Sequence, residues 1–450
     1  MKNVAKSMTS GSPIRLIVEF SIPVFLSALL YQLYSTADTM IVGRCLGVNS
    51  LAAVGSTGSL NYMVCGFCMG ICNGFAIPVA QRFGAGDEKG LKRIVVNSVW
   101  LSAILSVVIT VFVCFLCRSI LTWVRTPENV MREAYDYILI IFMGIPLLFL
   151  CNVSGGIIRS LGDSRTPLYF SVLSSLLNVG LDLVFIRIFH MGVKGPALAT
   201  VISQLFSGVL CLCHIRKHCE TLHMDREEWH PDRNNIRMLC AVGLPMGLQS
   251  SITAVGSVII QTAVNTLGSA SVAAVTAAGR INQLLCTPID ALASTMSTYA
   301  GQNMGAGKPE RIRQGMRVAM GIGVSYVVVA CLWLYCGGRA LAALFVGAEL
   351  GDIIDRAYQF QIVNGRFFVL LLAVNVFRIT IQGMGFTGLA MIAGICEMTA
   401  RTAAAFWLVP VWGFQAICYA NPMAWLAAGI FLVWAYQKCI RRIRMSTHFS

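Results

Sequence analysis

Charged side chains are scarce in this sequence. Asp, Glu, Lys and Arg make up 12% of its 450 residues, whereas soluble globular domains average about 25%. Hydrophobic residues make up 56%, and the mean hydropathy is +0.72. So little charge cannot cover a water-exposed surface, and the composition therefore excludes a soluble protein and indicates a membrane protein.

Histidine at membrane depth and a disulfide pattern are also lacking. All six histidines lie in connections, at helix ends or in the tail, so we expect no enzyme and no cofactor. Most of the 17 cysteines lie inside apolar runs, where cysteine acts as a small hydrophobic residue. Thiols and imidazoles gather in one cluster: Cys211, Cys213, His214, His218, Cys219 and His223. The cluster either binds a metal or is a juxtamembrane segment that happens to collect these side chains, and its spacing fits no zinc template.

The apolar runs predict an all-α membrane protein with twelve transmembrane helices. Each run approaches or exceeds the roughly 20 residues that a helix needs to cross a bilayer. The runs are 14–42, 51–81, 93–117, 131–157, 166–189, 193–213, 236–266, 270–301, 314–337, 353–380, 387–409 and 414–437.

Basic residues follow every second apolar run and predict the orientation. Lys89 and Lys92 lie in the second connection, Arg311 in the eighth, and Lys438 and Arg441 in the C-terminal segment. Because basic short loops stay cytoplasmic, we expect a multi-pass protein of the inner (plasma) membrane with both termini cytoplasmic. The net charge of +14 is then a topology signal, and we expect no nucleic acid as a partner.

The sequence repeats itself after about half its length. Residues 81–86 read QRFGAG and residues 302–307 read QNMGAG, an offset of 302 − 81 = 221. Paired halves in a membrane protein are typical of a pseudo-symmetric transporter whose substrate site lies between them. We expect an N-terminal six-helix lobe at 1–213, a cytoplasmic linker at 214–235 and a C-terminal six-helix lobe at 236–450. Because the symmetry is internal, we expect a monomer.

Acidic residues inside the apolar runs are the best pointers to function, because an ionised side chain in hydrocarbon costs roughly 2.5–3.5 kcal/mol on insertion scales. In the first half these acids are Asp38 and Asp182. Asn178 precedes Asp182 by four residues and shares its helix face, and Thr200 of the next run reaches a similar depth. Two carboxylates close together are not both ionised cheaply, so either a proton or Na⁺ would neutralise the pair. Separate pairing of each acid with hydroxyl groups or water is the alternative.

The second half carries different chemistry. Glu397 precedes Arg401 by four residues, the spacing at which opposite charges pair on a helix, so an internal ion pair would explain both. Asp290 follows Pro288 near the midplane. It is either a counter-charge for substrate or the partner of Arg280 or Arg378.

Several segments jointly resemble the multidrug and toxic compound extrusion (MATE) family over nearly the whole chain. They are DTMIVG at 38–43, the two glycine-rich connections described above, RSLGDSRTP at 159–167 and NVGLDLVFI at 178–186. The resemblance implies two six-helix lobes in a V that open alternately to each side, exporting organic cations in antiport with H⁺ or Na⁺. It also implies a cation site at Asp38, Asn178, Asp182 and Thr200, and a helix-one kink at Pro23 that is either linked to protonation or passive.

The sequence departs from the Na⁺-coupled relatives that place a Glu in helix seven and an Asp in helix ten. Residues 246–266 hold no acid, so coupling is expected in the first half, with H⁺ or Na⁺ undecided. Asp290, Glu397, Arg401 and Tyr34 stay candidates for a substrate or second-lobe polar site. A loose apolar lining is expected from side chains such as Tyr31, Met63, Met69, Phe149 and Met296.

The alternatives are a flippase, an exporter of a lipid-linked or other endogenous metabolite, and a channel. A flippase for a pyrophosphate-linked lipid would need a strongly cationic cavity, which the buried acids disfavour. A channel would need a polar ring that the two different halves do not supply.

Overall fold

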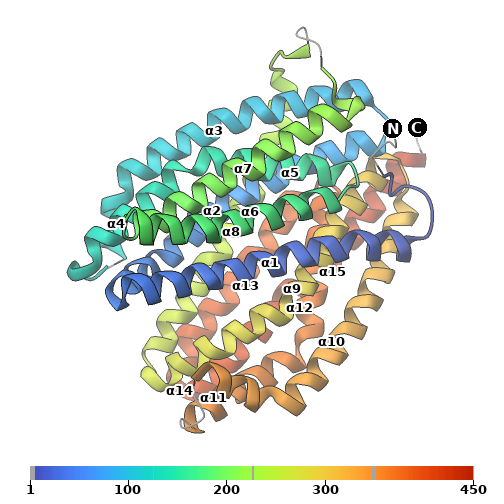
Figure 1. Cartoon of the computed structure of the whole chain (residues 1–450). Coiled ribbons are helices and arrows are strands. Elements are labelled where there is room, and N and C mark those ends of the chain that lie inside the picture. Colours follow the sequence, from blue (N-terminus) through green and yellow to red (C-terminus); the bar gives the residue numbers. More distant parts are fainter. Residues whose placement is uncertain (1–5, 125, 225–227, 347–350, 449–450) are drawn as a thin grey trace. The chain divides into compact units, whose positions relative to one another are not determined.

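The computed structural model describes residues 6–124, 126–224, 228–346 and 351–448, and these form helices joined by short connections (Figure 1). In the first half the helices are α1 (Pro13–Leu46), α2 (Val48–Gly84), α3 (Glu88–Trp123), α4 (Glu128–Met143), α5 (Ile145–Ser160), α6 (Arg165–Leu183) and α7 (Lys194–His218). In the second half they are α8 (Arg233–Asn265), α9 (Ser269–Gly305), α10 (Pro309–Val346), α11 (Gly351–Arg366), α12 (Phe368–Gly383), α13 (Thr387–Ala403), α14 (Val409–Trp412) and α15 (Phe414–His448). Two short π-helices, η1 (Val184–Ile188) and η4 (Ala404–Leu408), continue α6 and α13.

The described helices confirm the expected all-α membrane class. Nine of them are long and apolar enough to cross a bilayer, and two bent pairs, α4 with α5 and α11 with α12, pass the same test together. Helix α9, at 37 residues, is long enough but is rich in Ala, Thr and Ser and so less apolar. With each bent pair as one span, and α6 and α13 extended through their π-helices, the described residues form the twelve segments that the sequence predicted.

The internal repeat of the sequence is reproduced in the helix ends. Helix α9 starts and ends at the same offset from α2 as the two glycine-rich motifs, since 269 − 48 and 305 − 84 both equal 302 − 81. Each of the two helices is preceded by a glycine in the left-handed region, Gly47 and Gly268, and each is followed by another, Gly86 and Gly307. Only glycine adopts this backbone region at low cost, so these four glycines stop and restart the helices at matching places.

Each half also contains one sharply bent pair of helices. Helices α4 and α5 meet at 45° beside Gly144, and helices α11 and α12 meet at 53° beside Phe367. A Cβ added at Gly144 would lie 2.5 Å from the Val201 side chain of α7. The bend therefore brings backbone and neighbouring helix closer than any larger residue would permit.

Two compact units divide the described chain. Unit 1 comprises residues 1–10 and 22–247, and unit 2 comprises residues 11–21 and 248–450. The change of unit therefore falls inside α1, after Ser21, and inside α8, after Gly247, whereas the sequence placed the lobes on either side of a linker at 214–235. Residues 225–227 of that linker lie outside the described residues.

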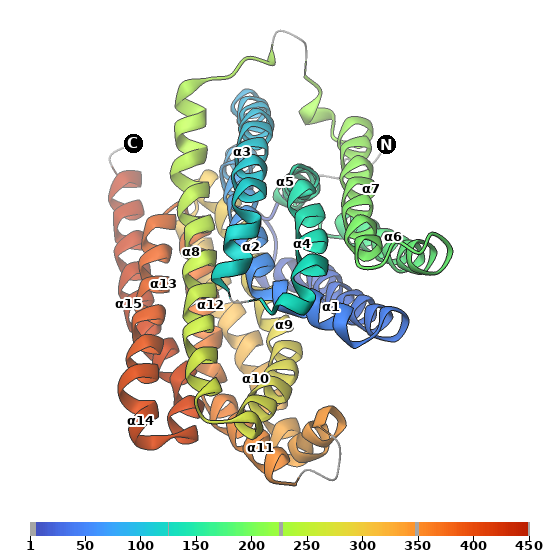
Figure 2. The ribbon, with the colours of Figure 1, turned by 90° about the vertical axis from the view of Figure 1, so that its left-hand side faces the viewer.

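The first part of α8 belongs to unit 1 because it packs backbone to backbone on α2. A Cβ added at Gly74 would lie 2.5 Å from the Cα of Gly243, and one at Gly70 would lie 2.8 Å from the Cα of Gly247. Phe75 lies beside Gly243 and belongs to the core of unit 1, together with Phe142 and Phe149; all three are at most 1% exposed. Within unit 1 helix α6 lies beside α7, and within unit 2 helix α13 lies beside α15 (Figure 2).

The described part of the linker packs on the start of α3. Asn97 Oδ1 accepts a hydrogen bond of 2.7 Å from the backbone N–H of Asp232, and Lys92 Nζ lies 3.3 Å from a Glu228 carboxylate oxygen. Asp87 caps the same helix by accepting from Gly90 N at 2.8 Å. That hydrogen bond, together with Arg82, lowers the pKa of the Asp87 carboxyl.

The contact between α2 and α8 gives a test of this packing. Gly74→Val should prevent α8 from seating on α2, because the added atoms would meet backbone that cannot move aside, and we expect a loss of about 2–4 kcal/mol of stability. Gly58→Val in the same helix is the control, since a Cβ at Gly58 meets nothing within 4 Å. Thermal unfolding in detergent compares the two. Equal melting temperatures for the two variants would contradict the packing.

Candidate functional site

A polar cluster lies inside unit 1, where α6 and α7 pack together. Asn178 and Asp182 lie one turn apart on α6 and are 2% and 0% exposed. Asn178 Nδ2 donates to Thr200 Oγ1 of α7 at 3.5 Å. Among the described residues neither carboxylate oxygen of Asp182 has a hydrogen-bond partner, and Asn178 Oδ1 has none either. Three buried acceptor oxygens are thus left for a bound cation or a proton.

Local sequence explains how α6 presents these side chains. Asp163 Oδ1 accepts from the backbone N–H groups of Arg165 and Thr166 at 2.9 and 3.1 Å, which fixes the start of the helix. Two residues after Asp182 the α-helix gives way to the π-helix η1. Short π-segments inside helices occur frequently at functional sites, because they leave backbone groups displaced from the regular pattern.

Asp38 of α1 joins the same cluster. Its side chain is half-buried, its Oδ1 atom has no hydrogen-bond partner among the described residues, and it interacts electrostatically with Asp182. The structure therefore brings together the four residues that the sequence nominated for a cation site: Asp38, Asn178, Asp182 and Thr200. Two like charges in a weakly polar interior repel, so full ionisation of both acids is unfavourable without a bound cation.

Tyr137 of α4 also belongs to the cluster, although the sequence did not indicate it. It is 7% exposed and interacts electrostatically with both Asp38 and Asp182. Its position in the sequence could have indicated this, because Tyr137 lies on the buried face of α4 with Val130, Ala134 and Ile141. A tyrosine on such a face brings a hydroxyl group into the interior and needs a polar neighbour there.

Two tyrosines lie on α1 before Asp38. Tyr34 lies one turn before Asp38, and its ring meets that of Tyr31 edge to face, with centroids 5.0 Å apart. Tyr34 also interacts electrostatically with Asp38. Two other side chains expected in an apolar lining are elsewhere: Phe149 is 1% exposed in the core of unit 1 and Met296 is 0% exposed in unit 2. Neither side chain is therefore exposed to line an open cavity.

Pro23 lies inside α1, which is helical from Pro13 to Leu46. It is the second residue of the part of α1 that belongs to unit 1. The carbonyl group of Pro23 accepts a hydrogen bond of 2.9 Å from Ser27 Oγ. Because proline lacks an N–H, the preceding turn loses one helix hydrogen bond at this point.

Unit 2 holds a second group of charges in its interior. Arg378 of α12 donates through Nη2 to Glu397 Oε1 of α13, and Arg401 Nη2 lies 3.7 Å from Glu397 Oε2. The expected pairing of Glu397 with Arg401 is therefore present, but Arg378 makes the closer contact. The three side chains are 7%, 3% and 8% exposed in the order Arg378, Glu397 and Arg401. Two cations share one anion away from water.

Asp290 of α9 is placed differently from the three buried charges. Its side chain is exposed, and its Oδ1 atom accepts a hydrogen bond of 2.8 Å from Asn375 Nδ2 of α12. Of its two expected partners, Arg378 is the one with which it interacts electrostatically. Asn375 was not foreseen, because a neutral amide gives no charge signal in the sequence.

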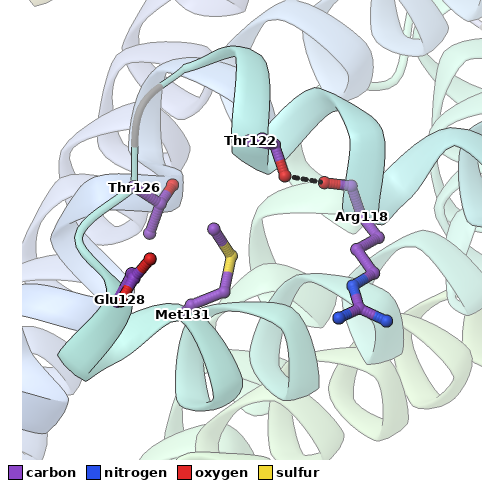
Figure 3. Close-up of a pocket in the computed structure, with 5 residues that line it drawn as sticks. All are labelled: Arg118, Thr122, Thr126, Glu128 and Met131. Carbon is purple, nitrogen blue, oxygen red and sulfur yellow. Dashed lines mark hydrogen bonds between the residues drawn. The ribbon is translucent and has the colours of Figure 1, made fainter.

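Two further features are separate from these clusters. A cavity of about 400 Å³ opens where α3 ends and α4 begins, with Arg118 and Glu128 on opposite sides of Met131 (Figure 3). Its lining includes none of the predicted cation-site residues.

In the Cys/His segment, His214 stacks on His218 and faces Asp163. The described residues contain no group of three or more His, Cys, Asp or Glu side chains arranged to hold a metal.

Comparison with known proteins identifies the class. The MatE family model matches residues 23–184 and 245–407, one match in each half, so the chain belongs to the MatE family. Members of this family are membrane transporters and not enzymes.

Named relatives agree with this assignment, and a solved structure shares the fold. The chain is 29% identical over 336 residues to the probable multidrug resistance protein YoeA of Bacillus subtilis, covering 73% of this chain and 72% of that protein. It is 24% identical over 343 residues to the FAD transporter of Shewanella oneidensis, covering 74% of each. The fold matches a crystal structure of MATE in complex with MaL6 with a TM-score of 0.91 at 24% identity, covering 99% of this chain and 100% of that one.

Proposed function

We propose that this protein exports organic cations from the cell by alternating access, as a multidrug efflux transporter driven by inward H⁺ or Na⁺. The single observation that supports this best is the buried carboxylate of Asp182, whose two oxygens have no hydrogen-bond partner among the described residues. A carboxylate in that position is stable only when protonated or bound to a cation. The name of the Bacillus subtilis relative, a probable multidrug resistance protein, agrees with the proposal.

The proposed mechanism is competition for the carboxylates of unit 1. A proton or Na⁺ arriving from outside binds at Asp38 and Asp182, with Asn178 and Thr200 supplying neutral oxygens. This removes negative charge from the unit and weakens its hold on a cationic compound, which is released. After the protein reopens to the cytoplasm, the ion leaves and another cationic compound binds. A ligand shifts such a two-state equilibrium only by its different affinity for the two states.

We place the protein in the inner (plasma) membrane, as a monomer with both termini cytoplasmic. Basic residues in alternate connections support this orientation, because positively charged short loops stay on the cytoplasmic side. Helices α2 and α3 meet at such a connection, with Lys89 and Lys92 at the start of α3, and helices α9 and α10 meet at another, near Arg311. Pro23 is proposed as a flexible point of α1, where the missing hydrogen bond lowers the cost of bending.

An exporter of an endogenous metabolite, including a lipid-linked one, is the second candidate. Arg378 and Arg401 favour it, because they give the interior of unit 2 two cations that share one glutamate. The name of the Shewanella oneidensis relative, an FAD transporter, indicates that a relative of similar length carries a phosphate-bearing compound.

Efflux of ethidium from liposomes containing the purified protein tests the proposal. Either a pH gradient or a Na⁺ gradient, imposed separately, should drive wild-type efflux, and Asp38→Asn should reduce the driven rate at least about tenfold because it removes one ionisable partner. Asp136→Asn is the matched control, since Asp136 pairs with Lys194 at 3.3 Å outside the cluster. Wild-type efflux that ignores both gradients would refute the coupling and favour the metabolite exporter.

A further inference from the structure

Four charged side chains on three helices of unit 2 form one connected group. Arg378 interacts with two acids, since it contacts Glu397 and interacts electrostatically with Asp290. Arg401 contacts the other carboxylate oxygen of Glu397. The three buried members, Arg378, Glu397 and Arg401, sum to one positive charge. The group is therefore neutral only when Asp290 is ionised.

Asp290 is the member of the group that a ligand can reach. Its side chain is exposed, whereas the other three are at most 8% exposed. Asn375 binds its Oδ1 atom and fixes the orientation of the carboxylate. The positive charge of Arg378 attracts the ionised carboxylate, whose negative charge offsets the buried excess of positive charge. Among the described residues, the thiol of Cys286, one turn earlier on α9, also interacts electrostatically with Asp290.

This arrangement is the opposite of the one in unit 1. There Asp38 and Asp182 repel each other, and neither forms an ion pair with Lys or Arg among the described residues. A carboxylate pair of that kind favours uptake of a proton or a small cation. A single exposed carboxylate that is oriented by an amide favours the positively charged group of a larger organic compound, because that group can reach the carboxylate and pair with its charge.

We propose that Asp290, exposed and oriented by Asn375, is a second binding site in unit 2 that takes the positively charged group of a transported compound. This inference rests on the proposed export of organic cations and adds a substrate contact to it. Arg378 and Asn375 are positioning residues, and Asp290 alone touches the ligand. Unit 1 then carries the coupling ion, and unit 2 contributes selectivity for cationic substrates.

Equilibrium binding of tetraphenylphosphonium to the purified full-length protein, without any ion gradient, tests the site. Asp290→Asn preserves size and removes the charge, so we expect the dissociation constant to rise at least about tenfold. Asp355→Asn is the matched control in the same unit, because Asp355 pairs with Arg339 on the exposed surface at 3.0 Å. The control should bind like wild type. Each variant is also checked for an unchanged melting temperature.

Asn375→Leu provides a second, charge-neutral test. It removes the hydrogen bond that orients Asp290, so the dissociation constant should rise about threefold. If Asp290→Asn binds the probe as wild type does, or if Asp290→Asn fails to fold and Asn375→Leu folds and binds as wild type does, the site is refuted while the proposed function stands. If the wild-type protein does not bind the probe, both the site and the proposed cation export are refuted.

Discussion

Replacing Asp182 with Asn should abolish ion-driven efflux without destabilising the protein. Asp182 is 0% exposed, and its two oxygens have no hydrogen-bond partner among the described residues. An amide of the same shape mimics the protonated acid permanently, so the cycle cannot release and rebind the ion. We expect driven ethidium efflux to fall at least about a hundredfold, which corresponds to about 2.7 kcal/mol. Proteoliposome efflux under an imposed pH or Na⁺ gradient measures the change.

The stability of the Asp182→Asn variant separates a functional role from a structural one. Removing an uncompensated buried charge should leave the melting temperature unchanged or raise it by a few degrees. An acid retained for structure would behave in the opposite way. A variant that exports at the wild-type rate, or that loses efflux together with its thermal stability, would contradict the assignment. Asp136→Asn again serves as the control.

Replacing Glu397 with Gln should destabilise the protein strongly. Glu397 is the shared anion of Arg378 and Arg401, and all three side chains are buried. Removing the central charge leaves two like charges close together away from water. Breaking a buried ion pair from one side costs about 3–5 kcal/mol. Thermal unfolding in detergent should show a melting temperature lowered by several degrees.

Simultaneous removal of all three charges is the informative control for that result. The triple variant Arg378→Met, Glu397→Leu and Arg401→Met keeps the volume roughly constant and leaves no buried charge unpaired. It should recover most of the stability that Glu397→Gln loses, because a well-packed apolar substitute for a buried ion group is often neutral or stabilising. A triple variant as unstable as Glu397→Gln would show that the loss arises from packing and not from charge.

The helices and their repeat were predictable because their signals are local. The long apolar runs and the glycine-rich turns at 81–86 and 302–307 set the helix ends, and those ends recur in the structure at the offset of the sequence repeat. The division into units was not predictable in the same way. It depends on Gly74 of α2 and Gly243 of α8, which are distant in the chain and meet across two helices. A sequence does not reveal which glycines face each other.

The candidate cation site was predictable in part for the same reason. Asn178 and Asp182 share a helix face by spacing alone, and an acid at membrane depth is visible in the sequence. Tyr137 was missed because a tyrosine in an apolar run gives no charge signal. The contact of Arg378 with Glu397, and that of Asn375 with Asp290, join different helices, so only the tertiary fold reveals them.

The most direct test of the central claim is release of the coupling ion when a cationic compound binds. Ethidium is added to purified protein in weakly buffered solution, and the appearance of free H⁺ or Na⁺ is recorded for the wild type and for Asp182→Asn. Competition at the unit 1 carboxylates predicts that the wild type releases one of the two ions and that the variant releases neither. Ethidium binding to the wild type without release of either ion, or equal release from both proteins, would contradict it.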